Sequence, residues 1–203
     1  GRGFACPVDL VLDNEGLLYV LSRGSSESDE WVEAKRITIC SLSEEYIKEF
    51  SSGGTQDGQI MWPSSIAMDS KENIYVADDA LNRISVFTKQ GQFLDRWGVK
   101  GEGPGQFKRP SSIIFDDNDV LILSDTLNHR IQRYTKEGQF LDQWGREGVK
   151  KGYLNMPWGL TLDNRGNIYV ADWRNDRVQK FDLGGTYLGS WGTSGDGDGQ
   201  FTR

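Results

Sequence analysis

The sequence has little of what metal and redox sites need. Its 203 residues include two Cys, Cys6 and Cys40, and one His, His129. Two Cys do not make a disulfide framework. One His excludes any metal site that requires two or more His ligands from this chain alone. A Ser-His-Asp triad would depend entirely on His129.

Long hydrophobic runs and an excess of positive charge are also lacking. The longest apolar run, from Leu17 to Leu21, has five residues, whereas a membrane-spanning helix needs ~20. With 30 acidic and 23 basic side chains, the formal net charge is −7. A negative field repels nucleic acid and anionic membrane surfaces. We therefore expect no nucleic-acid partner and no membrane insertion.

A repeat of 47 residues organises the chain. Pro, Asp, Arg and Trp recur at that spacing, as Pro63, Pro110 and Pro157, as Asp78, Asp125 and Asp172, as Arg83, Arg130 and Arg177, and as Trp97, Trp144 and Trp191. A weaker copy begins at Pro7, and its nine extra residues all fall between Ser22 and Arg36. We therefore expect four repeats, at about 1–57 with an inserted loop over 24–35, at 58–104, at 105–151 and at 152–203.

Each repeat contains four short apolar segments separated by turn residues. In the second repeat they are Ser65–Met68, Ile74–Ala77, Arg83–Phe87 and Gln92–Trp97. They are rich in β-branched and aromatic residues and lack a helical period, so we expect strands. Four antiparallel strands repeated every ~45 residues are typical of the blades of a β-propeller, an all-β fold. A single blade cannot bury both faces, so stacked blades must supply the core.

Three runs, Ser124–Gln132, Ile168–Asp172 and Arg177–Phe181, resemble the NHL repeat. The first repeat departs from this family, because Ser22 and Arg23 stand where Ala and Asp are expected. The resemblance implies a β-propeller of NHL type with four-stranded antiparallel blades. Such propellers usually have six blades, so four repeats imply part of a larger ring. The alternative is a four-bladed protein that closes alone or assembles with another copy through blades 1 and 4.

The family resemblance also implies a function. NHL propellers commonly bind proteins, peptides or small ligands on the loop face around the channel, so we expect a non-catalytic binding or scaffold module without a cofactor. The alternative is a metal-dependent propeller enzyme of the amidating-lyase-like or lactonase-like kind. Its metal would be held in the channel, where this chain offers a poor ligand set of Asp9, Ser65, Ser112 and Gly159. The remaining ligands would lie outside this chain.

Residues that recur in every regular repeat are expected to hold the scaffold, because an active site would not recur. We expect each Asp that ends a second strand to cap the next turn and to pair with the Arg five residues later. The Asp that follows the first strand of each repeat should form an Asx turn; these residues are Asp69, Asp116 and Asp163. The repeating Trp should pack between blades.

Two other features have a structural interpretation as well. The stretch 196–199 begins like a calcium loop, but no acid occupies its twelfth position. We therefore expect a glycine-rich linker there and assign no metal ligand. Cys40 replaces an aromatic residue of the other repeats and is expected to be a small buried hydrophobe. A disulfide between Cys6 and Cys40 is the alternative.

The functional prediction rests on residues that differ between repeats. Trp158 replaces a Ser of the other repeats, Trp173 and Arg174 occupy the loop after a second strand, and Trp31 lies in the inserted loop among four acids. Because Trp and Arg are enriched where partners dock, we predict that these four residues bind a protein or peptide ligand. The acidic loop favours a ligand with a basic segment. His129 is assigned to the same face as a hydrogen-bonding loop residue, and the competing interpretation is that the Trp rings only pack on neighbouring loops.

Overall fold

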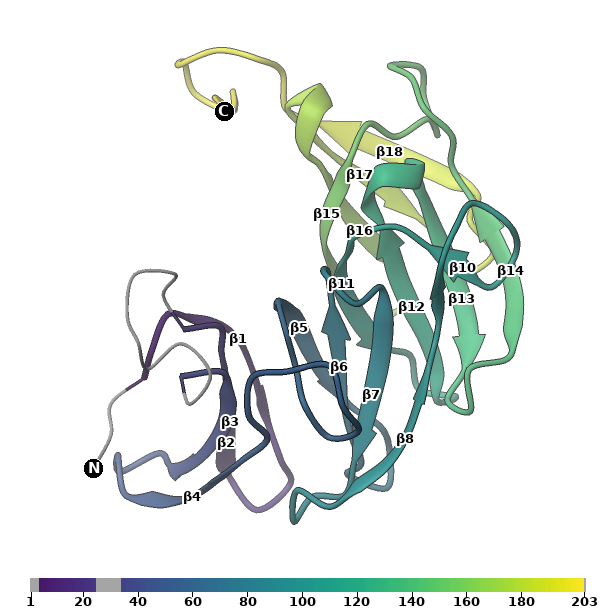
Figure 1. The fold of residues 1–203 in the computed structure, drawn as a ribbon. Coiled ribbons are helices and arrows are strands. Elements are labelled where there is room, and N and C mark those ends of the chain that lie inside the picture. The colour runs from purple at the N-terminus through teal and green to yellow at the C-terminus, as the bar shows by residue number, and fades with distance from the viewer. Residues whose placement is uncertain (1–3, 25–33, 203) are drawn as a thin grey trace. The chain divides into compact units, whose positions relative to one another are not determined.

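The structure, a computed structural model, describes residues 4–24 and 34–202. The chain divides into two compact units, residues 1–100 and 101–203. Each unit contains two four-stranded antiparallel sheets, which Figure 1 shows as successive meanders along the chain. The prediction of an all-β chain built from four-stranded blades is confirmed.

The first unit holds blades 1 and 2. Blade 1 consists of β1 (Pro7–Leu12), β2 (Leu17–Ser22), β3 (Arg36–Ser41) and β4 (Tyr46–Phe50). Blade 2 consists of β5 (Pro63–Met68), β6 (Ile74–Asp78), β7 (Arg83–Phe87) and β8 (Phe93–Trp97). In both blades the strands pair in sequence order. The predicted segments of the second repeat agree with these strands to within two residues.

The second unit holds blades 3 and 4. Blade 3 consists of β11 (Pro110–Phe115), β12 (Val120–Asp125), β13 (Arg130–Thr135) and β14 (Phe140–Trp144). Blade 4 consists of β15 (Pro157–Leu162), β16 (Ile168–Asp172), β17 (Arg177–Phe181) and β18 (Tyr187–Trp191). Single 3₁₀ turns, η1 (Thr126–Asn128) and η2 (Trp173–Asn175), follow their second strands. Two short strands, β9 (Val99–Lys100) and β10 (Gln106–Phe107), precede blade 3.

Apolar side chains from neighbouring blades form the core of each unit, as the stacking argument predicts. In the first unit, Tyr19 and Ile37 of blade 1 share a buried cluster with Ile66 and Phe87 of blade 2. In the second unit, Ile122 of blade 3 joins the buried cluster of blade 4. β-Branched residues suit this packing, because alternate strand side chains point to opposite faces of each sheet.

The Trp that ends the last strand packs between blades where the next blade lies in the same unit. Trp144 lies against Phe181 of blade 4, with ring centroids 6.1 Å apart, which confirms its predicted role. Trp191 instead contacts Tyr169 of its own blade at 5.6 Å and is 48% exposed. Its predicted inter-blade contact is therefore not found among the described residues.

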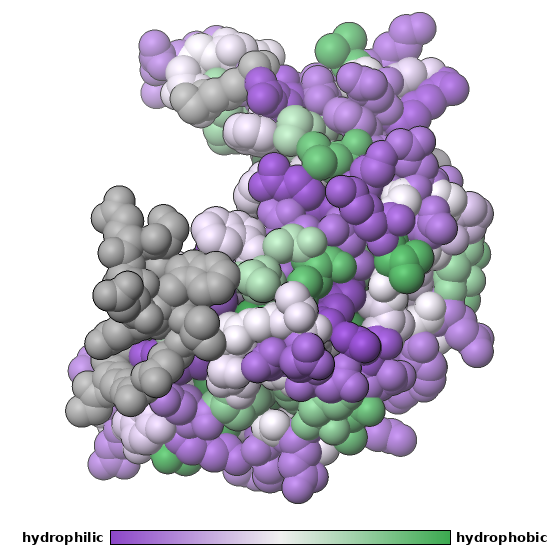
Figure 2. Space-filling model, in the orientation of Figure 1, coloured by the Kyte–Doolittle hydropathy of each residue, from purple (hydrophilic) through white to green (hydrophobic). Residues whose placement is uncertain are grey.

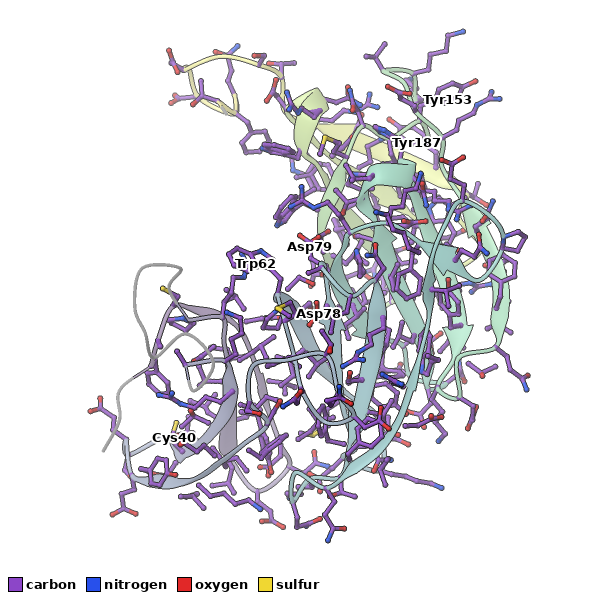
Figure 3. The ribbon with its side chains drawn as sticks, in the orientation of Figure 1. Cys40, Trp62, Asp78, Asp79, Tyr153 and Tyr187 are labelled. Atoms are coloured by element: carbon purple, nitrogen blue, oxygen red, sulfur yellow. The ribbon has the colours of Figure 1, made fainter. Side chains whose placement is uncertain are left out.

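The recurring Asx turns are confirmed, and so is the linker. Asp69, Asp116 and Asp163 each accept hydrogen bonds from backbone N–H groups two and four residues later. The stretch 196–199 lies in a turn closed by a bridge between Ser194 and Phe201, as in the earlier linkers. Cys6 and Cys40 are free thiols, and Cys40 is buried on β3 (Figure 3).

Candidate docking site on blade 4

The site begins with an Asp–Arg clamp that fixes the loop end of blade 4. Asp172, fully buried at the end of β16, accepts hydrogen bonds from Arg177 Nε at 2.8 Å, Asn175 Nδ2 at 2.8 Å and Gln179 Nε2 at 2.9 Å. Arg177 also donates to the carbonyl oxygens of Lys150 and Tyr153 in the preceding linker. The clamp therefore ties linker, loop and blade together.

Blade 3 repeats this clamp, with Asp125 as the buried carboxylate. Asp125 accepts hydrogen bonds from Arg130 Nε at 2.7 Å, Asn128 Nδ2 at 2.8 Å and the backbone N–H of Lys108 at 2.7 Å. Burial raises the pKa of Asp125 above its ordinary value, and these three donors oppose the rise. The predicted Asp–Arg pairs are confirmed in blades 3 and 4.

Blade 2 departs from this pattern. Asp78 accepts from the backbone N–H groups of Met61, Trp62 and Leu81, so the predicted turn cap forms. Figure 3 shows Asp78 near Trp62, at the same end of the blade. Arg83 donates to linker carbonyl oxygens, and no hydrogen bond or ion pair joins it to Asp78 in the part of the chain that the structure describes. The predicted pair is therefore wrong for blade 2.

The physical reason lies at two positions beside the carboxylate. Blades 3 and 4 each supply an Asn three residues after the Asp and a Gln seven residues after it, and both amides donate to the carboxylate. Blade 2 has Leu81 and Ser85 at these positions. The N–H of Met61 donates to Asp78 as its equivalents Lys108 and Asn155 donate in blades 3 and 4. Asp78 accepts in addition from the backbone N–H groups of Trp62 and Leu81 in place of the two side-chain amides.

Two exposed indole rings lie at the loop end of blade 4, beside the clamp. Trp158, the second residue of β15, and Trp173, the first residue of η2, lie with ring centroids 5.6 Å apart and planes at 62°. The side chains are 43% and 40% exposed. Arg174 places its guanidinium carbon 4.8 Å from the centroid of the Trp173 ring, within the range of a cation–π contact. The structure thus brings three of the five predicted ligand-binding residues together.

The side chain of His129 is hydrogen-bonded to the backbone just before Trp158. His129 lies at the end of η1 with φ 55°, and its Nδ1 accepts a hydrogen bond from Met156 N at 3.2 Å. In the same loop, Thr126 Oγ1 donates to the carbonyl oxygen of Pro157 at 2.8 Å. The blade 3 loop is therefore bonded to the residues that lead into Trp158, which confirms His129 as a loop hydrogen-bonding residue. Trp31, the fifth predicted residue, lies outside the described residues.

Sequence reasoning missed a second cationic–aromatic cluster, in blades 1 and 2. Arg23 lies with its guanidinium carbon 4.9 Å from the Trp62 ring centroid, and Lys35 Nζ lies 5.6 Å from it. Lys35 is fully buried, and burial lowers its pKa while Asp78 opposes the change. Neither cation recurs in the repeat, so the 47-residue spacing gave no signal for this cluster.

A second group of exposed hydrophobic residues, Phe4, Leu10, Leu42 and Tyr46, lines a cavity on blade 1. On the face that Figure 2 draws, hydrophobic surface appears as separate green patches within a mostly purple polar surface. Single exposed hydrophobic residues are normal for a folded protein. Among the described residues, no group of three His, Cys, Asp or Glu side chains is arranged to hold a metal ion, and no helix has the length and hydropathy to cross a membrane.

Comparison with known proteins agrees with the geometry of the blades. The family described as 6-bladed beta-propeller matches residues 27–145, more than half of the chain, and the NHL repeat matches residues 154–181. No curated protein matches the sequence.

Solved structures show the same fold at low sequence identity. Virginiamycin B lyase from Staphylococcus aureus is 16% identical with a TM-score of 0.65, over 92% of this chain and 56% of that one. Glutaminyl cyclase from Myxococcus xanthus is 18% identical with a TM-score of 0.60, over 92% of this chain and 70% of that one. The chain thus spans little more than half the length of the lyase. These identities establish the fold and nothing about activity.

Proposed function

The chain belongs to the 6-bladed beta-propeller family, and from this premise we propose that it is a non-catalytic module that docks a protein or peptide on the loop face of blade 4. The observation that carries the proposal is the exposed Trp158–Trp173 pair. Trp and Arg dominate the energetics of docking surfaces, and Trp173 and Arg174 supply both side by side.

The structural demands of the fold do not account for these rings. The equivalents of Trp158 in blades 2 and 3 are Ser64 and Ser111, and those of Trp173 are Asp79 and Thr126. All of these loops form with small or polar residues at the same positions. Two large rings left 40% and 43% exposed therefore support a partner that covers them.

Selection from a library of random 12-residue peptides tests the docking role. We expect enriched peptides to bind the parent chain and to lose at least tenfold in affinity for the W158A/W173A variant. The L141A variant is the matched control, because Leu141 is 44% exposed on β14 of the neighbouring blade. Equal binding of the selected peptides to the parent and the double variant would place the docking surface elsewhere.

The competing hypothesis is a propeller enzyme. Two of the structurally similar proteins are a lyase and a cyclase. Metal analysis of the purified full-length protein separates the two proposals. We expect a module to hold no stoichiometric transition metal, whereas one metal ion per chain would favour the enzyme.

We propose in addition that blades 1 and 4 associate with a second copy of the chain. Blade 1 has a cavity of about 650 Å³ lined by Leu10, Cys40 and Tyr46, and Cys40 stands where other blades place an aromatic ring. Blade 4 ends in the half-exposed Trp191, whose equivalent Trp144 packs on the next blade. Light scattering over a concentration series should show self-association that W191A weakens, and a strict monomer at every concentration would refute it.

A further inference from the structure

We infer that Trp191 of one copy inserts into the blade 1 cavity of a second copy, so that copies join head to tail. This inference rests on the self-association proposed above, and it adds which side chain enters, which cavity receives it and how successive copies are oriented. The chain contains an internal template for the contact. The Trp144 ring, at the end of blade 3, packs on Phe181 of blade 4 with ring centroids 6.1 Å apart.

Trp191 supplies the inserted ring because it occupies the position of Trp144 one repeat later. The residues that end the last strands of blades 1, 2 and 3, which are Phe50, Trp97 and Trp144, are all half-buried, whereas Trp191 is exposed. Trp is the residue type most enriched at the centre of docking surfaces. An exposed ring at a position that is otherwise used for packing between blades therefore favours a protein surface as its partner.

The receiving cavity lies on the blade 1 face that corresponds to the Phe181 face of blade 4. Cys40 pairs with Tyr46 across β3 and β4, as Phe181 pairs with Tyr187 across β17 and β18. Cys40 and Tyr46 both line the cavity. The side chain at the Phe181 position is therefore a thiol, and the space that an aromatic ring would fill is open.

Two sequence differences in blade 1 shift the place of the inserted ring toward β3. A Cβ on Gly185 would lie 2.6 Å from Cγ of Trp144, so the glycine of blade 4 allows the close approach of that ring. Blade 1 has Glu44 at the same repeat position, and Glu44 lines the cavity. An inserted ring must therefore lie further from this turn than Trp144 does. Cys40 provides the room, because it is smaller than Phe181 by a whole ring.

The rim of the cavity supplies the rest of the contact. Leu10, Leu42 and Tyr46 line the cavity and are exposed. A large aromatic side chain buries about 150–250 Å², against roughly 800 Å² per partner in a standard interface. We therefore expect weak association that increases with protein concentration.

The two contact surfaces differ, since one is a protruding ring and the other is a cavity. Such a contact is heterologous, so it does not close after two copies unless its rotation forms a ring. Each copy that contributes its Trp191 still has an open cavity, and each copy that contributes its cavity still has an exposed Trp191. The parent chain should therefore form species larger than a dimer as its concentration rises.

Sedimentation velocity of the full chain over a concentration series tests this polarity by complementation. C40F fills the cavity with the ring that other blades carry and keeps Trp191, whereas W191A keeps the cavity and removes the ring. Each variant alone should associate at least tenfold more weakly than the parent. When mixed, the two variants should form a one-to-one complex that does not grow, because each contributes one working surface.

Three further variants control the experiment. L188A removes an exposed Leu from β18, the strand that carries Trp191, and it should associate like the parent. C40A leaves the cavity open and should do the same. L10E places a charge on the exposed rim and leaves β3 unchanged, so it replaces C40F in the mixture if C40F lowers the melting temperature.

The outcomes separate this contact from self-association in general. Association that persists in both W191A and the cavity variants, or a mixture of the two that stays monomeric, would overturn the Trp191 contact, while association of the parent would still stand. A parent chain that stays monomeric at every concentration, including one in which Trp191 fills the cavity of its own chain, would overturn both proposals.

Discussion

The packing between blades 1 and 2 predicts an unequal cost for two glycine substitutions with the same backbone. Gly91 lies in the hairpin between β7 and β8 with φ +84°, and Gly16 lies in the turn between β1 and β2 with φ +83°. A Cβ on Gly91 would lie 2.4 Å from Cγ of Phe50, whereas a Cβ on Gly16 would meet no heavy atom within 4 Å. The pair therefore separates backbone strain from steric conflict.

The expected magnitudes follow from these two contributions. A left-handed conformation costs an L-residue about 1–2 kcal/mol, so G16A should lower the free energy of unfolding by about 1 kcal/mol. G91A adds displacement of the Phe50 ring, and overpacking typically costs about 1–3 kcal/mol, for a sum of about 2–4 kcal/mol. Glu44 occupies the same repeat position in blade 1 with φ 66°, which shows that a left-handed residue with a side chain is accepted at this turn position.

Urea unfolding of a double-mutant cycle measures the steric part. In an F50A background the ring is gone, so G91A should cost about as much as G16A does in the parent chain. Two results would refute the reasoning. One is a G91A cost within about 0.5 kcal/mol of the G16A cost in the parent, and the other is an excess cost that persists after Phe50 is removed.

Two further substitutions probe the interfaces. W144A should lower the free energy of unfolding by about 3 kcal/mol in a urea series, because it empties a large aromatic site between blades. W191A should lower it by less than about 1 kcal/mol, because the Trp191 ring is 48% exposed. Equal costs would contradict the inter-blade assignment. Lys89 contacts Asp13 at 2.9 Å and Glu72 at 3.1 Å. Hydrogen bonds, including those from Lys89, outweigh burial at Asp13 and lower the pKa values of both acids. Their stabilising contribution is therefore complete above about pH 5 and lost as pH falls below about 4. K89M should flatten this acid limb in thermal unfolding followed from pH 7 to pH 3, and an unchanged slope would exclude the contact as its cause.

The repeat made the fold predictable from the sequence. A fixed spacing of 47 residues located blades 2 to 4, and a weaker copy with nine extra residues located blade 1. The turn chemistry around Asp69, Asp116 and Asp163 located the hairpins. The turn signals are local, because each depends on residues a few positions apart. The grouping of Trp158 with Trp173 was also predictable, since both occupy the loop end of one blade.

Contacts that depend on neighbouring blades were not predictable in the same way. Lys89 of blade 2 reaches Asp13 of blade 1, and Lys35 approaches the Trp62 ring across 27 residues. Neither distance follows from repeat spacing, because both depend on how two sheets pack. The missing Asp78–Arg83 pair did carry a signal, since Leu81 and Ser85 break the pattern of Asn and Gln. That signal can be interpreted only when the structure shows that four groups donate to the carboxylate in blade 4, two of them the Asn and Gln amides.

Within each loop, some residues hold the backbone and others are exposed, which explains why the binding chemistry can differ between blades of one fold. In blades 3 and 4 the loop backbone is held by an Asn amide that bridges the buried Asp to a linker carbonyl oxygen, as Asn175 does between Asp172 and Gly148. A residue with positive φ then ends each loop, His129 in blade 3 and Asp176 in blade 4. The first two loop positions are Thr126 and Leu127 in blade 3 but Trp173 and Arg174 in blade 4, so the same clamp accepts different side chains at these positions. Selection on a partner can therefore act on these positions while the clamp beneath them stays the same.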